Sequence, residues 1–391
     1  MIKSIKIMLN PNNKQKTKIL QCANVSRWAY NWDLGRQQEN YKSGGKFISD
    51  GDLRKELTQL KKVEEYKWLN DYSNNITKQA IKDACDAYKR FFKGQSKFPK
   101  FKRKKKSKPS FYQDICKIQF TETHVKLEKL TDSKKKNKQK INWIRLAEHN
   151  RIPFGKDVKY INPRITFNGL NWFISVGIEY EDEVKQPSNE GIGIDLGITD
   201  LAICSDGNTY KNINKSNKIK KIEKQRRRLQ RQISRKYENN REGVRYKKTS
   251  NIIKSEKQLL KLNHKLTNVR NQYQHSVINE IIGRKPMFIT IEDLNISGMM
   301  KNKHLSKALQ QQSLYEFTRK LTYKSKWNNI ELRRVDRYFP SSKLCSDCGT
   351  KNSKLKLSDR QWVCIECGTI HDRDYNASKN LRDCMEYKII A

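Results

Sequence analysis

Long apolar segments are missing from this sequence of 391 residues. No run approaches the roughly 18 to 20 apolar residues that a membrane-spanning helix needs. The start, MIKSIKIML, also lacks the continuous apolar region and the cleavage site of a signal peptide. These absences argue against a helical membrane protein and against secretion, so we expect a cytosolic protein.

Acidic residues are scarce, because 41 Asp and Glu stand against 83 Lys and Arg, a formal net charge of +42. So large an excess is hard to keep soluble and compact without a polyanionic partner. Seven Trp, 17 Tyr and 13 Phe lie among the charges and offer rings on which unpaired bases can stack. A Lys-rich composition from an AT-rich genome is the plain alternative, but it does not explain the size of the excess. The expected partner is nucleic acid.

Several common catalytic signatures are absent as well. The glycines at positions 191, 193 and 197 are not followed by a P-loop lysine at the required spacing, so nucleotide hydrolysis is not expected. No Ser-His-Asp or HExxH arrangement is present to compete for a hydrolytic role. Carboxylates are therefore the remaining catalytic candidates.

Nine cysteines without a secretion signal indicate a reducing compartment, where paired CxxC motifs bind metal instead of forming disulfides. Two such pairs, about fifteen residues apart, match the zinc-ribbon template. They consist of Cys345, Cys348, Cys364 and Cys367. Because all four positions are thiolates and none is left open, we expect a structural zinc ion. The other cysteines are expected to be small buried apolar residues: Cys22, Cys85, Cys116, Cys204 and Cys384.

Three acidic motifs are spread through the second half of the chain. GIDLG carries Asp195, TIEDLN carries Glu292 and HDRDYNA carries Asp374. Each also has a plain structural interpretation: a turn after a strand, a strand end with its acids in solvent, and a helix N-cap, for which Asn376 is a second candidate. Taken together, they form the kind of carboxylate set that gathers two magnesium ions from separate segments in a nuclease.

Hydrophobic periodicity divides the first half into a helical part and a strand-rich part. After an opening strand, helices are expected at residues 14–31, 53–60 and 76–92. Strands are expected at residues 117–120, 124–127, 141–146, 164–167 and 172–180, with an Asn168-Gly169 hairpin turn. This section predicts a small antiparallel β-barrel or sheet. A low-complexity loop at residues 134–140 interrupts this section, and a polar linker at residues 181–189 follows it.

The second half predicts an RNase H-like α/β core, because strands and helices alternate and acids stand at strand ends. Residues 218–282 form either one long helix or two helices joined by a bend near residues 239–243. The other expected elements are strands at 191–200, 201–205, 288–294 and 330–335 and helices at 314–326 and 377–381.

Two basic segments are candidate nucleic-acid contacts. Residues 98–106 (FPKFKRKKK) are too charged to pack and are typical of a linker or a phosphate-contacting arm. Residues 224–235 form an arginine-dense helix, for which a solvated face is the common alternative. Acidic partners are scarce here, so contact with nucleic acid is favoured. The candidate residues are Lys100, Lys102, Arg103, Arg226, Arg227, Arg228 and Arg231.

The order of these motifs resembles the TnpB family, the OrfB proteins of transposons, which are RNA-guided nucleases related to the type V CRISPR effectors. GIDLGI, IEDLN, the SKLC of residues 342–345 and the DRDYNA of residues 372–377 match the family's RuvC and zinc-ribbon motifs in order. Softer matches are RWAYN at 27–31, AYKRFF at 87–92 and PKFK at 99–102. The resemblance covers nearly the whole chain.

The resemblance implies a multidomain α+β fold. It consists of an RNase H-like (RuvC) α/β nuclease domain with an inserted zinc ribbon, a β-barrel wedge domain and a helical recognition lobe. The expected boundaries are residues 1–10 and 107–185 for the wedge, 11–106 for the recognition lobe, 189–340 and 370–391 for the RuvC-like domain and 341–369 for the zinc ribbon.

The same resemblance implies roles for individual residues. Asp195, Glu292 and Asp374 are the catalytic residues and bind two magnesium ions, and Asp374 is preferred to Asp372 because it belongs to the Asp-x-Asn-Ala pattern. Arg373 either touches phosphate or pairs with an acid. On the recognition helix, the residues expected to read a short motif next to the target are Lys78, Gln79 and Lys82.

The implied activity is magnesium-dependent cleavage of target double-stranded DNA, with a guide RNA from the transposon end supplying the sequence by base pairing. We expect one or two protein copies per RNA, in the prokaryotic cytosol and at the nucleoid when DNA is bound. Two alternatives stay open: an RNA-guided or direct DNA-binding regulator without cleavage, and an RNase H-like transposase.

Overall fold

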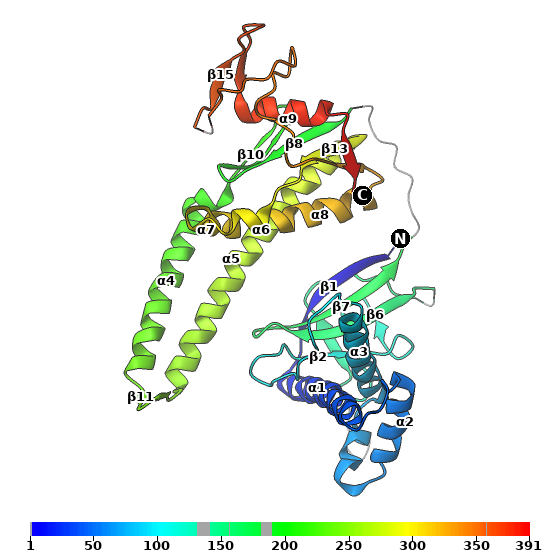
Figure 1. Cartoon of the computed structure of the whole chain (residues 1–391). Coiled ribbons are helices and arrows are strands. Elements are labelled where there is room, and N and C mark those ends of the chain that lie inside the picture. The colour runs from blue at the N-terminus through cyan, green and yellow to red at the C-terminus, as the bar shows by residue number, and fades with distance from the viewer. Residues whose placement is uncertain (1, 131–140, 156, 181–189, 357) are drawn as a thin grey trace. The chain divides into compact units, whose positions relative to one another are not determined.

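The computed structural model describes residues 2–130, 141–155, 157–180, 190–356 and 358–391. Its contacts divide the chain into two compact units, Met1–Glu181 and Asp182–Ala391 (Figure 1). The loop expected at 134–140 and the linker expected at 181–189 lie outside the described residues. Within the described ranges, no helix combines the length and the apolar character that a membrane crossing requires.

The first unit contains a seven-stranded antiparallel sheet with the order β2-β6-β7-β1-β5-β4-β3. Its strands are β1 (Ile2–Asn10), β2 (Ser110–Tyr112), β3 (Gln119–Phe120), β4 (His124–Lys126), β5 (Trp143–Leu146), β6 (Tyr160–Phe167) and β7 (Trp172–Glu179). The predicted hairpin joins β6 to β7, and Gly169 there has a φ of 96°, which favours glycine. The end strands β2 and β3 do not pair with each other in the described residues.

Along the chain, helices lie between β1 and β2. They are α1 (Asn13–Lys42), α2 (Asp50–Leu60), the 3-10 helix η1 (Glu64–Asp71) and α3 (Asn74–Phe92). A capping box of Asn12 and Gln15 begins α1. The helix runs past its predicted end at residue 31 because Leu34 packs with Ala80 and Ala84 of α3. Tertiary packing, which local periodicity does not report, therefore sets its length.

The basic segment at residues 98–106 is partly packed, which corrects the expectation that it is too charged to pack. The Asn31 side chain donates to the Lys102 carbonyl at 3.0 Å and accepts from the Lys102 amide at 2.8 Å. The Lys102 ammonium lies 3.6 Å from the centroid of the Tyr30 ring. Pro99 is buried, whereas Lys100 and Arg103 are exposed. The aliphatic stem and an aromatic partner let Lys102 pack despite its charge.

The second unit contains a six-stranded mixed sheet with the order β10-β9-β8-β13-β14-β17. Its strands are β8 (Ile192–Leu196), β9 (Asp200–Cys204), β10 (Thr209–Lys211), β13 (Phe288–Glu292), β14 (Glu331–Val335) and β17 (Tyr387–Ile389). The pairs β8/β13 and β13/β14 are parallel, and the remaining pairs are antiparallel. The predicted strands near residues 191–200, 201–205, 288–294 and 330–335 are confirmed, with shifted ends.

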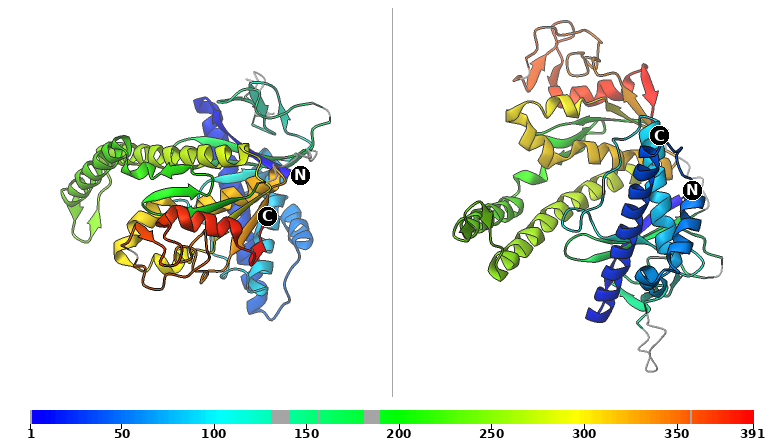
Figure 2. Two further views of the ribbon diagram at one scale, coloured as in Figure 1. Left: turned by 90° about the horizontal axis from the view of Figure 1, so that it is seen from above. Right: turned by 60° about the horizontal axis from the view of Figure 1, so that its bottom comes forward.

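Helices cover both faces of this sheet (Figures 1 and 2). The helices of this unit are the 3-10 helix η2 (Ile213–Lys215), α4 (Asn217–Glu238), α5 (Ser250–Gly283), α6 (Ile296–Met299), α7 (Lys303–Gln312), α8 (Leu314–Trp327) and α9 (Arg373–Asp383). Of these, α4 packs along α5 and extends away from the sheet. On one face, Ile281 of α5 and Phe317 of α8 share a buried cluster with Ile194 and Ile291. The other face carries α9.

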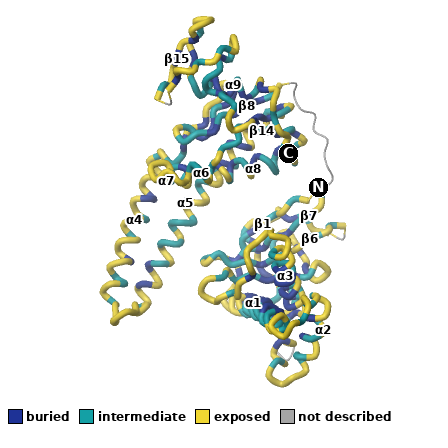
Figure 3. Tube along the Cα trace, viewed as in Figure 1, coloured by how far each residue is buried: buried dark blue, intermediate teal, exposed yellow. Residues whose placement is uncertain are grey.

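Two helices, and not one, span residues 218–282. A small hairpin of β11 (Arg241–Glu242) and β12 (Arg245–Tyr246) joins α4 to α5 in place of the expected bend. The end of the pair near this hairpin is largely exposed (Figure 3).

Four of the five scattered cysteines are buried as predicted, namely Cys22, Cys85, Cys204 and Cys384. The prediction is wrong for Cys116, which is exposed. It lies in the turn after Asp114, whose carboxylate accepts from the Cys116 amide, and residue type alone does not reveal such a turn.

Candidate acidic site and cysteine cluster

Strand alternation places two of the predicted acids side by side. Ile192 and Ile194 of β8 point into the core, so Asp195 points to the opposite face. In the parallel register Ile291 pairs with Ile194, which sets Glu292 beside Asp195 where the two strands end. Asp195 therefore belongs to a strand and not to a turn, and both side chains are half-buried.

A glycine lets α9 bring the third acid to this face. A Cβ on Gly193 would lie 2.0 Å from the Ser378 carbonyl oxygen and 2.4 Å from the Arg382 amide nitrogen. The backbone of α9 thus lies directly on β8. Asp374 stands in the first turn of this helix, one to two turns before the contact.

The interpretation of Asp374 as a helix N-cap is wrong. Asp372 caps α9, and its side chain accepts from the amides of Asp374 at 3.1 Å and of Tyr375 at 2.9 Å. Asn376 is not a cap either, because it is buried within the helix. The Asp374 carboxylate therefore does not cap α9.

The pKa values of the two strand-end acids, Asp195 and Glu292, are both raised. Burial, followed by the charges of Asp374 and Glu292, raises the pKa of Asp195 to about 7, although Arg373 and Arg360 oppose the shift. Burial and the neighbouring Asp293 raise the pKa of Glu292. Neither the Asp195 nor the Glu292 carboxylate makes a hydrogen bond or ion pair with another described residue. Carboxylates in this condition are stabilised by a cation or a proton.

Arginines hold the neighbouring acids. Oδ1 of Asp374 accepts from Arg373 Nε at 2.9 Å and Nη2 at 2.8 Å, and Oδ2 accepts from Arg360 Nη1 at 2.9 Å. Of its two proposed roles, Arg373 thus pairs with an acid in this structure. Asp293, which follows Glu292, pairs with Arg337 at 3.0 Å and with an arginine of β14 at 3.4 Å.

The three acids lie on one face but do not form a closed ligand set. Among the described residues, the group whose potential ligand atoms all lie within 4.8 Å of one another is formed by cysteines. Like charges disfavour the close approach of three carboxylates, and arginines already donate to both oxygens of Asp374.

The four predicted cysteines meet in one cluster. Sulfur atoms of Cys345 and Cys367 lie 3.6 Å apart, and those of Cys348 and Cys364 lie 3.5 Å apart. Each pair folds as a tight turn, in which the glycine amide donates to the first cysteine's carbonyl at 2.9 or 3.0 Å. The two glycines, at positions 349 and 368, have φ angles of 75° and 70°. This spacing suits four thiolates around one tetrahedral ion.

The cysteine cluster is attached to the helix that carries Asp374. The short hairpin of β15 (Gln361–Val363) and β16 (Ile370–Asp372) leads straight into α9. Asn376 of α9 donates to the Leu344 carbonyl at 2.6 Å and accepts from the Ser346 amide at 2.9 Å, next to Cys345.

A histidine that the sequence did not single out also contacts the cluster. His371 of β16 is buried, and its Nε2 lies 3.0 Å from the Cys345 sulfur. Its ring packs on Trp362 with a centroid distance of 4.8 Å. His371 follows the second CxxC pair in the sequence, but this position alone does not predict a contact with Cys345. The contact can be inferred only when the hairpin register, with Trp362 opposite His371, is known.

The predicted nucleic-acid contacts lie in both units. In the second unit, Arg228 and Arg231 line a groove of about 840 Å³ between α4 and α5, together with Lys261. Arg226 is half-buried, and Arg227 is exposed and lies 3.8 Å from Glu223.

The predicted contacts on α3 belong to the first unit. Lys78 and Lys82 are exposed there. Gln79 donates to Asp83 at 2.9 Å, and Asp83 forms a bidentate pair with Arg164. The orientation of Gln79 is therefore fixed by the fold.

Comparisons with known proteins agree with this organisation. Family models match three segments: a helix-turn-helix domain at residues 1–46, a family described as "Probable transposase" at 174–303, and a Cas12f1-like TNB domain at 315–381. A protein of Streptomyces pristinaespiralis named as an RNA-guided DNA endonuclease is 29% identical over 382 residues, covering 97% of this chain and 88% of its own length.

Two further comparisons span most of the chain. The protein InsQ of Escherichia coli K12, also named as an RNA-guided DNA endonuclease, is 28% identical over 396 residues, 97% of this chain and 91% of its own. The structure of a Cas12f1-sgRNA-target DNA complex matches with a TM-score of 0.61 at 15% identity, covering 96% of this chain and 83% of that one, which shows a similar fold. The three family-model matches and the relatives aligned over 97% of this chain support the resemblance to the TnpB family that the order of the motifs indicates.

Proposed function

We propose that this protein is an RNA-guided DNA endonuclease of a transposon that cuts target DNA next to a short adjacent motif. Two relatives that match it along nearly its whole length carry the name of that activity. The observation that carries the proposal is the pair Asp195 and Glu292, half-buried at adjacent strand ends on the face where α9 brings Asp374. Neither carboxylate has a hydrogen-bond partner among the described residues. Acids so placed are typical of a cation-dependent active site.

The strand order supports the RNase H-like assignment of the second unit. Three antiparallel strands, β10, β9 and β8, are followed by the parallel strands β13 and β14, with acids at the ends of β8 and β13. We assign the RuvC-like domain to residues 189–340 and 370–391 and the zinc ribbon to 341–369. In the first unit, the wedge-like domain comprises residues 1–10 and 107–185, and the recognition lobe comprises 11–106.

The residues fit two kinds of metal. Carboxylate oxygens of Asp195, Glu292 and Asp374 are the hard ligands that magnesium prefers. Bound there, magnesium would activate the attacking water and stabilise the leaving 3′ oxygen. The chain contributes the positions of these acids, with β8 and β13 fixing two of them and Arg373 and Arg360 restraining the third. The clustered cysteine sulfurs fit structural zinc.

The guide RNA supplies the sequence specificity in this proposal, so the protein needs to hold phosphates more than to read bases. The exposed arginines of the α4/α5 groove are suited to that task. On α3, Lys78 and Lys82 are exposed and remain the proposed readers of the adjacent motif.

The test begins with the RNA that co-purifies with the protein. The proposal expects one discrete RNA that maps to the 3′ flank of the gene, whereas random cellular RNA contradicts it. Changing the guide segment of that RNA should then move the cut to the newly matched sequence.

A transposase is the second candidate, because the family model that matches residues 174–303 carries that description. Strand-transfer products formed by the purified protein without RNA would favour this candidate over the first. The same reaction with guide RNA, magnesium and target DNA serves as the comparison.

A further inference from the structure

The turn between β8 and β9 begins two residues after Asp195, and side chains from elsewhere in the unit hold it. Three successive carbonyl oxygens each accept a hydrogen bond. The bonds are Gln312 Nε2 to Gly197 O at 3.2 Å, Asn212 Nδ2 to Ile198 O at 2.7 Å and Lys215 Nζ to Thr199 O at 3.0 Å. The position of this turn is therefore set by residues that precede α4 and by the last residue of α7.

The Gln312 amide can adopt one orientation here. Its side chain is buried, and its Oε1 accepts from Asn214 Nδ2 at 3.2 Å. The donor end must then face the turn, where the Asp200 carbonyl lies 3.5 Å away in addition to that of Gly197. A flipped amide would place two oxygens against each other in a buried site.

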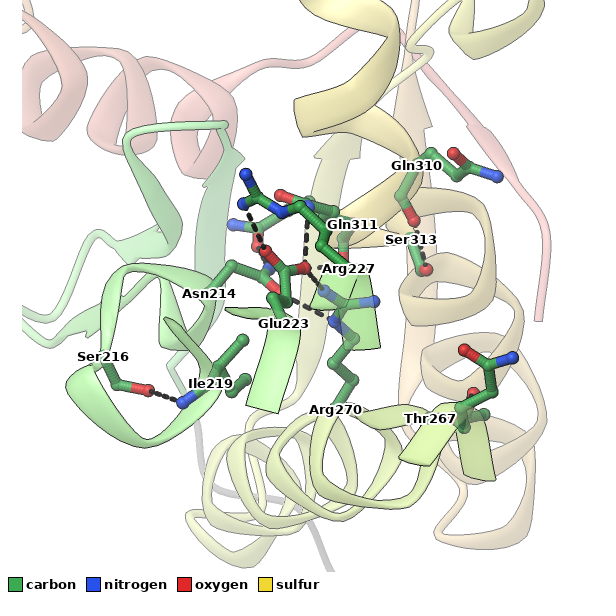
Figure 4. A network of polar contacts seen from close by, with 12 residues as sticks. Asn214, Ser216, Ile219, Glu223, Arg227, Thr267, Arg270, Gln310, Gln311 and Ser313 are labelled. Carbon is green, nitrogen blue, oxygen red and sulfur yellow. Dashed lines mark hydrogen bonds and ion pairs between the residues drawn. The ribbon is translucent and has the colours of Figure 1, made fainter. Parts of the chain in front are cut away.

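Asn214 connects the Gln312 amide to α4 and α5. Figure 4 shows Asn214 beside Arg270 and Glu223. Asn214 Oδ1 accepts from Arg270 Nε at 2.7 Å. Arg270 Nη2 donates to Glu223 at 2.9 Å, and Glu223 also accepts from Gln311 at 2.8 Å. These hydrogen bonds link α4, α5 and α7 to the turn.

We propose that Gln312 and Asn212 are positioning residues for DNA cleavage, which act by fixing the β8–β9 turn and thereby the direction of the Asp195 side chain. This inference rests on the proposed function. The Asp195 carboxylate makes no hydrogen bond or ion pair with the described residues, so its strand and the following turn decide where the carboxylate points. Catalysis by positioned acids is sensitive to displacements of about 1 Å.

Two nearly isosteric variants test the proposal. Gln312→Met keeps the length of the side chain and removes both polar ends. Asn212→Asp removes the donor to Ile198 but keeps an oxygen that can accept from the Asn214 amide and cap η2. The assay is cleavage by the complete complex with guide RNA at saturating target DNA, alongside target binding, magnesium dependence and thermal stability.

Both variants are expected to cut on the order of 100-fold more slowly and to bind target DNA within about twofold of the unmodified protein. The magnesium concentration for half-maximal cleavage should rise. A merely structural role would lower stability and binding together, without this separation.

Neighbouring glutamines of α7 provide a matched control. Gln310 is exposed, and its side chain has no hydrogen bond among the described residues, whereas Gln312 is buried. Gln312→Glu and Gln310→Glu add the same charge two residues apart. Slow cleavage is expected from the first alone.

Cleavage at the unmodified rate in Gln312→Met and Asn212→Asp would overturn the proposal, as would a parallel loss of binding and cleavage. If one variant does not fold, the other decides. Asp195→Ala separates this inference from the proposed function: if that variant still cuts, the active-site assignment fails, whatever the glutamine variants do.

Discussion

Replacement of Gly193 by alanine tests how the candidate site is assembled. The added Cβ would stand 2.0 Å from the Ser378 carbonyl and 2.4 Å from the Arg382 amide, and both are backbone atoms of α9. The first contact must lengthen by about 1 Å before it reaches 3.0 Å, below which real Cβ contacts essentially never occur. A helix backbone cannot rotate away as a flexible side chain can, so α9 has to retreat from β8.

Two consequences follow from that retreat. Overpacking of this kind costs about 1–3 kcal/mol, and the backbone contact favours the upper end of the range. Asp374, which we propose to be catalytic, moves with α9, and a displacement of about 1 Å in such a group is expected to lower activity on the order of 100-fold. We therefore expect Gly193→Ala to lose stability and cleavage while retaining RNA binding, which we assign to other surfaces.

The assay combines thermal unfolding with guide-dependent cleavage, both at fixed magnesium. Gly283→Ala is the control, because a Cβ there meets no atom within 4 Å. This second variant is expected to match the unmodified protein or to gain up to about 1 kcal/mol in stability. Unchanged stability and cleavage in Gly193→Ala would refute the close approach of α9 to β8.

Three further predictions concern other parts of the chain. Cys364→Ser should lose the one zinc ion expected per chain, measured by metal analysis of the purified protein; retention of one ion would contradict the thiolate site. Asp33 is buried, and burial raises its pKa from 3.8 to about 7. The folded state then binds its proton more tightly than the unfolded state, so the melting temperature should fall as pH rises from about 4 to about 7, and Asp33→Asn should remove much of that fall. An equal pH dependence of the melting temperature in the unmodified protein and in Asp33→Asn would contradict this role of Asp33. Glu292→Gln should cut at least about 100-fold more slowly, whereas Asp293→Asn, whose carboxylate pairs with arginines, should retain most activity in the same single-turnover assay; equal losses would remove the distinction.

The elements that local patterns describe were predictable. Alternating Ile and Gly around Asp195 identified β8, the Asn168-Gly169 pair identified a hairpin, and the CxxC spacing identified a cluster whose sulfurs do converge. Each signal lies within a few residues and has one dominant physical cause.

Features that depend on distant partners were not predictable. The full length of α1 needs α3, and the packing of Lys102 needs Tyr30. Asp372 and Asp374 are both plausible caps by residue type, and only the backbone of α9 decides between them. Gln312 has no sequence signal at all, because its role depends on a turn more than a hundred positions earlier.

We propose that Asp195 belongs to the site that cuts DNA, while other surfaces of the protein bind the DNA. The most direct measurement compares Asp195→Ala with the unmodified protein, each loaded with the same guide RNA, for target binding and for cleavage in magnesium. We expect binding within about twofold of the unmodified protein and no detectable cut. Cleavage that persists in this variant, or binding that disappears with it, would contradict the account.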